Sequence, residues 1–192
     1  QNIKLTEGSK TIFTNQGETP IYASFDWSGV PKEPVYNSNH GIEVSVEHYL
    51  VKAAQATKLP ANNTLSSGEL LLTRITVTSD ERVPDALLAN LMPAGLELEN
   101  QNLANSLKLA DIKNDGKSLT ISEQIEHQEY RDDRYIAVLD LPERGTQTLY
   151  VLSRAVNPGV YTFPAVRIES MYKPSVYGVG GSIKQITVNA KP

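Results

Sequence analysis

The sequence contains no cysteine, one tryptophan and two methionines among its 192 residues. Without cysteine, the chain can form no disulfide, no thiolate metal site and no thiol nucleophile of its own. This absence does not identify a compartment, because reduced cytosolic proteins and cysteine-free exported domains share it. A chain of this length can nevertheless bury a stable core without a disulfide or a structural metal.

Long apolar runs are missing as well, since no stretch approaches the ~20 residues that span a bilayer. The chain opens on Gln1 and Asn2, without an initiator methionine or a signal peptide. We therefore expect it to be a piece of a longer protein. An excess of positive charge is also absent, because 18 Lys and Arg face 22 Asp and Glu, a formal net charge of −4. This balance argues against a nucleic-acid surface.

Short alternating runs separated by turn residues extend along the chain. In residues 42–47, Ile and Val alternate with Glu and Ser, which is typical of a strand with one wet face. Residues 59–68 read as a polar loop, and residues 114–116, Asn-Asp-Gly, as a tight hairpin turn. Further strands are expected at residues 70–77, 135–139, 149–156, 160–168 and 183–188. About nine strands in all predict an all-β fold, an antiparallel two-sheet sandwich, with at most one short helix near residues 103–110.

The first part of the chain differs from the rest. Residues 15–17, Asn-Gln-Gly, form a plausible tight turn, and residues 29–34 hold two prolines and suggest a stiff connection. Alternation places Trp27 on the same side as Ile21, which favours burial of the indole. We expect residues 1–36 to be strands that complete or link from a preceding domain, and residues 37–192 to form the sandwich.

Candidate catalytic and metal-binding residues are few. The histidines, His40, His48 and His127, are expected at the surface and too dispersed for a shared metal site. Residues 111–116 faintly resemble a calcium loop, but a lysine occupies the third ligand position, so a hairpin is favoured. Asp132 and Asp133 invite an acid–base interpretation. Alternation puts them on opposite strand faces, each beside an arginine, which favours structural ion pairs. We predict no catalytic residue, no metal and no cofactor.

Residues 170–174, Ser-Met-Tyr-Lys-Pro, are the most unusual segment. Met171 and Tyr172 are costly to leave in water, so either they pack inward on a strand end or they contact another domain. The proline at position 174 stops the strand. Five further tyrosines predict a tyrosine-rich surface, at positions 36, 49, 130, 161 and 177.

Five blocks, in order, resemble the C-terminal (tenth) macroglobulin-like domain of bacterial alpha-2-macroglobulins. Residues 91–100 read Leu-Met-Pro-Ala-Gly-Leu-Glu-Leu-Glu-Asn, similar to the family's Leu-Leu-Pro-Ala-Gly-Phe-Glu-Ile-Glu-Asn. Residues 130–134 match its Tyr-Arg-Asp-Asp-Arg, and residues 154–159 its Arg-Ala-x-x-Pro-Gly. Residues 169–174 resemble its Glu-Ala-Met-Tyr-x-Pro, and residues 29–31 its Gly-x-Pro. The resemblance implies that residues 37–192 fold as a macroglobulin-like β-sandwich.

This resemblance implies a non-catalytic domain of a protease-trapping inhibitor. Its loop, Met171, Tyr172, Lys173 and Pro174, would pack on a neighbouring thioester-type domain of the same parent chain and shield the thioester from water. The parent would meet target proteases in the periplasm, and a lipid anchor elsewhere in it would hold it to the inner membrane. Two other classes stay open: an extracytoplasmic adhesin or carbohydrate-binding module, with Trp27 in an exposed aromatic platform, and a hydrolase using Asp132 or Asp133.

Overall fold

The computed structural model describes residues 10, 12, 14–22, 33–103, 106–119 and 125–191. The chain divides into two units, residues 1–32 and residues 33–192. In the first unit, the amide of Gly17 donates to Oδ1 of Asn15 at 2.9 Å, and Nδ2 of Asn15 donates to the Thr19 carbonyl at 2.9 Å. The turn predicted here is confirmed. Trp27 lies outside the described residues, and the boundary expected near Tyr36 stays a prediction.

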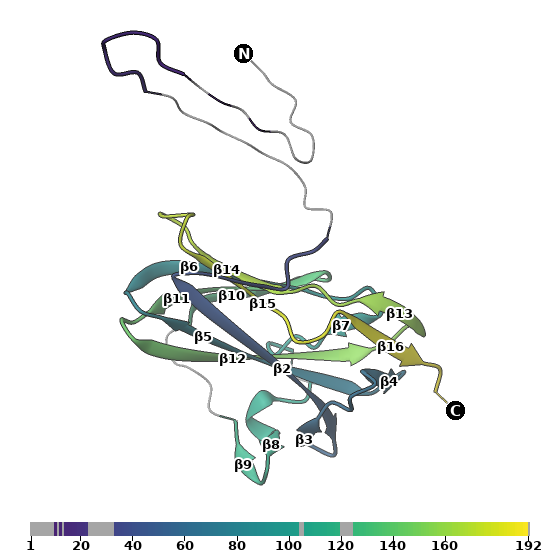
Figure 1. Cartoon of the computed structure of the whole chain (residues 1–192). Helices are drawn as coiled ribbons and strands as arrows, with labels where there is room; N and C mark the ends of the chain where they lie inside the picture. The colour runs from purple at the N-terminus through teal and green to yellow at the C-terminus, as the bar shows by residue number, and fades with distance from the viewer. Residues whose placement is uncertain are drawn as a thin grey trace. The chain divides into compact units, whose positions relative to one another are not determined.

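The described residues of the second unit form three sheets (Figure 1). The first sheet has the order β1 (Asn37–His40), β15 (Tyr177–Gly180), β14 (Val166–Ser170), β6 (Val83–Leu91), β11 (Arg134–Leu141) and β10 (Ile125–Tyr130). The second has the order β7 (Leu96–Leu98), β12 (Gly145–Ala155), β5 (Leu70–Ser79), β2 (Ile42–Lys52), β3 (Gln55–Lys58), β8 (Lys113–Asn114) and β9 (Lys117–Ser118). The third has the order β13 (Gly159–Thr162), β16 (Gln185–Asn189) and β4 (Thr64–Ser66).

The main core lies between the first two sheets. Alternate side chains of β2 and β5 on one side meet those of β6, β11 and β14 on the other, as strand geometry requires. Ile42, Ile75, Leu88, Leu139 and Ile168 are fully buried there. The predicted antiparallel sandwich is therefore confirmed.

The second sheet is covered on both sides at one end. Tyr49, Leu72 and Leu152 point away from the main core and pack against Leu109 and Ile112 from the segment that follows β7. The only helix in the described residues is the 3-10 turn η1 (Leu109–Asp111), within the expected limit of one short helix. The predicted hairpin turn joins β8 to β9, with positive φ of 50° and 75° at residues 115 and 116.

The third sheet departs from the sequence-based expectations. Residues 160–168 were predicted as one strand, but Pro164 stands between β13 and β14, which belong to different sheets. The loop expected at residues 59–68 contains β4, which pairs in parallel with β16. Its Leu65 is 1% exposed and packs with Phe163 and Ile186 in a separate core cluster. Tertiary pairing thus makes a strand of a locally polar segment.

Candidate functional site

The turn between β14 and β15, here called the Met-Tyr loop (residues 171–176), carries the residues singled out from the sequence. Met171 is 44% exposed and Tyr172 is 77% exposed, and Lys173 and Pro174 are exposed as well. In Figure 1 the loop extends beyond the end of the sheet, on the opposite side of the sandwich from the third sheet. Of the two alternatives, packing inward on the strand end does not describe these side chains.

Hydrogen bonds hold the Met-Tyr loop at both of its ends. The Ser170 amide donates to the Val176 carbonyl at 3.0 Å, and the Val176 amide donates to the Lys173 carbonyl at 2.8 Å. The Lys173 amide donates to the Ser170 hydroxyl at 3.2 Å. The Met171 amide donates to the Asp85 carbonyl of β6 at 3.2 Å. The loop therefore presents two apolar side chains to solvent from an ordered backbone.

Residue Asp85, which accepts that bond, lies in an irregular part of β6. Its φ is 48°, in the left-handed region, and its amide donates to Oδ1 of Asp140 at 3.3 Å. Arg82 forms an ion pair with Asp140 at 2.9 Å. The hydrogen bond from the Arg82 guanidinium lowers the pKa of the Asp140 carboxyl, which stays ionised at neutral pH. This polar cluster positions the backbone that supports Met171.

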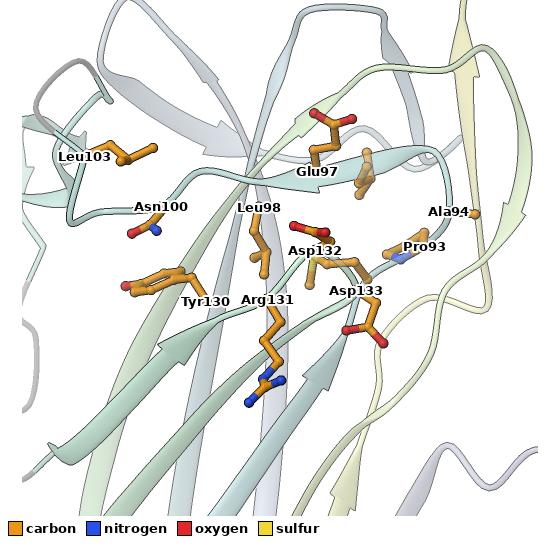
Figure 2. Close-up of a pocket in the computed structure, with 12 residues that line it drawn as sticks. Pro93, Ala94, Glu97, Leu98, Asn100, Leu103, Tyr130, Arg131, Asp132 and Asp133 are labelled. Atoms are coloured by element: carbon orange, nitrogen blue, oxygen red, sulfur yellow. The ribbon is translucent and has the colours of Figure 1, made fainter.

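A second candidate is a hollow of about 750 Å³ between the segment after β6 and the turn joining β10 to β11. Its lining combines apolar and charged residues (Figure 2): Met92, Pro93, Ala94, Leu96, Glu97, Leu98, Asn100, Leu103, Tyr130, Arg131, Asp132 and Asp133. The Met92 amide donates to the Asp133 carbonyl at 2.9 Å and joins the two segments. This hollow contains both aspartates of the acid–base interpretation.

The two aspartates do not form an acid–base pair. They lie in the turn before β11, not within a strand as expected, and Figure 2 shows their carboxylates pointing in different directions. Arg134 binds the Asp133 carboxylate at 2.5 Å and lowers its pKa by hydrogen bonding. Arg131 pairs with Glu129 at 2.8 Å, so the expected Arg131–Asp132 pair is wrong. A carboxyl that acts as a general acid needs a raised pKa, and the pKa of Asp133 is shifted in the opposite direction.

The histidines are dispersed as expected, but the expected surface position of His48 is wrong. His48 is 5% exposed, and burial lowers its pKa to about 4. His40 stacks on Tyr177 with ring centroids 4.4 Å apart, and His127 is exposed on β10. Within the described part of the chain, no group of three or more His, Asp or Glu side chains could hold a metal ion.

The expected tyrosine-rich surface is wrong at Tyr49, and the other four tyrosines reach the surface only in part. Tyr49 is 7% exposed and belongs to the core that covers the second sheet, and Tyr36, Tyr130, Tyr161 and Tyr177 are half-buried. The aromatic platform of a carbohydrate-binding module depended on Trp27, which lies outside the described residues. No helix in the described ranges is long and apolar enough to cross a membrane.

The three-sheet β architecture and the exposed hairpin loop define a macroglobulin-like β-sandwich. The sequence profile of the bacterial alpha-2-macroglobulin MG10 domain matches residues 41–175, and the chain belongs to this family. The chain is 40% identical over 171 residues to the alpha-2-macroglobulin of Xylella fastidiosa (strain Temecula1 / ATCC 700964) and 38% identical over 173 residues to that of Escherichia coli (strain K12). Each alignment covers 88% of this chain and 10% of the relative. The chain thus spans about a tenth of the length of these relatives.

Solved structures show the same likeness. Native Escherichia coli alpha-2-macroglobulin, from domain MG7 to the C-terminus, is 35% identical with a TM-score of 0.69. The comparison covers 84% of this chain and 25% of that chain. Salmonella alpha-2-macroglobulin reacted with methylamine is 34% identical with a TM-score of 0.63, over 84% of this chain and 10% of that chain. The family resemblance carried by the five sequence blocks is therefore confirmed.

Proposed function

We propose that the chain is the non-catalytic C-terminal domain of a bacterial alpha-2-macroglobulin, a protease-trapping inhibitor. In this proposal the Met-Tyr loop packs on a thioester-type domain of the same parent chain and keeps water from the thioester. The parent acts in the periplasm and is held to the inner membrane by a lipid anchor elsewhere in its chain. The observation that carries the proposal is the exposure of Met171 and Tyr172 on an ordered loop.

Chemistry supports a shielding role for these two side chains. A thioester survives only where water and amines are excluded, which requires a close-fitting apolar cover. Methionine is flexible and fills irregular gaps, and tyrosine adds a broad rigid ring, so both are enriched in interface cores. Pro174 fixes the backbone just beyond them, and Lys173 places a charged group at the rim. A loop already held by hydrogen bonds also loses little entropy on docking.

The solved relatives support the same function. One was studied after reaction with methylamine, a small amine of the kind that attacks thioesters, and others are described as activated by trypsin or by porcine elastase. These statements concern the Salmonella and Escherichia coli proteins. Identities of 34 to 35% over 84% of this chain support carrying the protease-trapping role to its parent.

The test replaces Met171→Ala and Tyr172→Ala together in the full-length parent. We expect free thiol to be released faster, because water reaches the thioester once the cover is gone. The fraction of protein whose thioester can still react with methylamine should fall faster for the same reason. The thiol is measured with a chromogenic disulfide reagent over time, with and without methylamine. In the isolated 192-residue chain the same double variant should leave the melting temperature nearly unchanged, because both side chains are exposed within this domain.

The matched control is Val160→Ala on β13, an apolar side chain that is 64% exposed and lies outside the Met-Tyr loop. It should leave thiol release at the level of the unmodified parent. Equal rates for the double variant and this control would refute the shielding role. The family assignment would stand in that case, because it does not depend on these two residues.

A further inference from the structure

β7 is an edge strand of the second sheet, and one side of its backbone faces no other strand. In the described part of the chain, β7 pairs only with β12, and Leu98 stands opposite Ser153. The amide of the next residue, Glu99, donates to the Leu152 carbonyl at 2.9 Å. In an antiparallel pair this pattern directs the amide and the carbonyl of Leu98 away from β12. No described residue bonds to either group, so this edge can accept a further strand.

The free edge of β7 adjoins the hollow of about 750 Å³ described above. Residues 96–98 line this hollow, whereas its lining includes no residue of β12. Part of the lining is apolar: Leu103 is 60% exposed, and the ring of Tyr130 leans on that of Tyr135 with centroids 5.2 Å apart. The volume lies within the range of ordinary ligand sites. A segment that pairs with β7 therefore has space for its side chains.

The charge of the hollow is negative and only partly compensated. The arginines at positions 131 and 134 are already held in ion pairs with neighbouring carboxylates. Glu97 and Asp132 also line the hollow, and neither takes part in an ion pair among the described residues. Uncompensated negative charge beside an aromatic ring favours a lysine or arginine side chain in an occupant.

The two sides of β7 differ in character. Figure 2 shows the Glu97 carboxylate on one side of the β7 ribbon, and Leu98 and Asp132 on the other. A strand added along the edge continues this alternation, so its residue opposite Glu97 shares the Glu97 side and its neighbours face Leu98. Opposite charges attract when they stand directly across two strands, and apolar side chains pack there as well. The geometry thus fits a segment in which basic and apolar residues alternate.

This edge is separate from the Met-Tyr loop. Asp85, which accepts the Met171 amide, lies near the start of β6, and Met92 of the hollow directly follows the end of β6. At about 3.3 Å per residue, residues 85 and 92 are roughly 20 Å apart along the strand. A partner at β7 is therefore independent of the shielding role.

We propose that the free edge of β7 and the adjoining hollow bind an extended segment of a separate protein, in which lysine or arginine alternates with apolar residues. The segment adds to the second sheet as a strand. Backbone hydrogen bonds to Leu98 hold it, and Glu97, Asp132 and the apolar lining select its sequence. Because β7 has only three residues, the contact is small and the complex is short-lived.

A short peptide in which lysine alternates with valine, blocked at both ends, serves as the probe. Added to the isotope-labelled 192-residue chain, it should cause saturable NMR shifts at the amides of residues 96–99 and 130–133. A peptide with glutamate in place of lysine should bind about ten-fold more weakly by fluorescence anisotropy, because the charges then repel. The lysine peptide with N-methylated amides should weaken similarly, because it cannot donate to β7. Equal affinity for the N-methylated peptide, or no saturable shift at β7, would overturn the proposal.

Two charge reversals locate the binding site. Glu97→Lys on β7 is matched with Glu43→Lys on β2, an exposed position separated from β7 by β12 and β5. Both variants change the net charge equally. Glu97→Lys should weaken the lysine peptide several-fold and strengthen the glutamate peptide, whereas Glu43→Lys should change neither affinity. Equal weakening in the two variants would reduce the effect to a general attraction toward an acidic chain and contradict the proposal.

Other occupants of the edge give different results. If the full-length parent binds the lysine peptide as tightly as the 192-residue chain does, the edge is open to a separate protein. Loss of binding in the parent would mean that one of its own domains covers β7. Shifts at residues 96–98 that grow with the concentration of the chain alone would make the occupant a second copy. Either of these two results would show the inference to be wrong.

Discussion

His48 lies in the interior with its ring beside Thr73 and Phe163. Its Nδ1 is 3.1 Å from the Thr73 hydroxyl, and its ring centroid is 4.6 Å from that of Phe163. Burial disfavours the charged form of the ring and lowers its pKa from 6.5 to about 4. The folded protein therefore keeps this ring neutral at a pH where the unfolded chain protonates it.

This shift predicts a loss of stability in mild acid. Between pH 6.5 and about 4 the unfolded chain binds a proton that the folded chain does not, so the free energy of unfolding falls as pH falls. The full loss is on the order of 3 kcal/mol and is complete below the folded pKa. Urea unfolding at several pH values measures the free energy of unfolding as a function of pH. In this pH window that free energy should change less steeply with pH for His48→Gln than for the unmodified protein.

His127→Gln is the control for this experiment, because His127 is exposed on β10. It should leave the pH dependence of the unfolding free energy as it is in the unmodified protein. Identical slopes for the two variants would show that His48 does not carry the effect.

At the scale of elements, β15 lies close against β2 because it is built on glycines. A Cβ at Gly178 would be 2.3 Å from the Ile42 carbonyl oxygen, and one at Gly180 would be 2.4 Å from the Val44 carbonyl oxygen. The neighbouring backbone cannot move aside as a flexible side chain could. The glycine-rich run in residues 178–181 thus has a packing role.

Gly180→Ala should destabilise the domain by about 2–4 kcal/mol, because the methyl group forces β15 away from β2. Gly17→Ala, whose nearest atom would be 3.5 Å away, is the matched control and should change stability little. Thermal unfolding followed by circular dichroism measures both. A melting temperature for Gly180→Ala equal to that of the control would contradict the close approach.

The sequence predicted those elements whose signal is local. Alternation in residues 42–47 located β2, and the Asn-Asp-Gly turn located the β8–β9 hairpin. β4 was missed because its pairing with β16 is long-range and only Leu65 in it is deeply buried. The break between β13 and β14 was missed because residues on both sides of Pro164 favour strands.

The candidate site residues also divide into those with a local sequence signal and those whose position depends on distant parts of the chain. Met171 and Tyr172 stood out because two large apolar side chains precede a proline. The half-buried, outward position of Ile136 and Val138 could not be predicted, because residues 135–139 form a continuous apolar run. Such a run reads as buried on both sides, and only the neighbouring strands decide which side is covered. The depth of His48 depends likewise on Phe163, which is far away in sequence.

At the scale of the whole molecule, the third sheet closes one end of the sandwich. Ile186 and Val188 of β16 are buried with Leu65 of β4 and Phe163. These residues come from three distant parts of the chain, and only β16 touches both β4 and β13 through strand pairing. The stability of this end therefore depends on one short strand.

Ending the chain after Lys184 should abolish cooperative folding or lower the unfolding free energy by several kcal/mol. Each buried aliphatic side chain of β16 contributes about 1.5–3 kcal/mol, and Leu65 loses its cover as well. Ending it after Asn189 removes only the residues beyond β16 and should leave the melting temperature unchanged. Denaturant unfolding of both truncations measures the difference, and equal midpoints would contradict the role of β16.

The pairing of β4 with β16 also determines how late in synthesis the third sheet can fold. β4 ends at residue 66 and its partner begins at residue 185, so a ribosome must translate nearly the whole domain before this pair can form. Until then Leu65 and Phe163 have no partner strand, and a nascent chain exposes them to chaperones and to its neighbours. β16 is the last strand to be synthesised, and its pairing completes the fold of the domain.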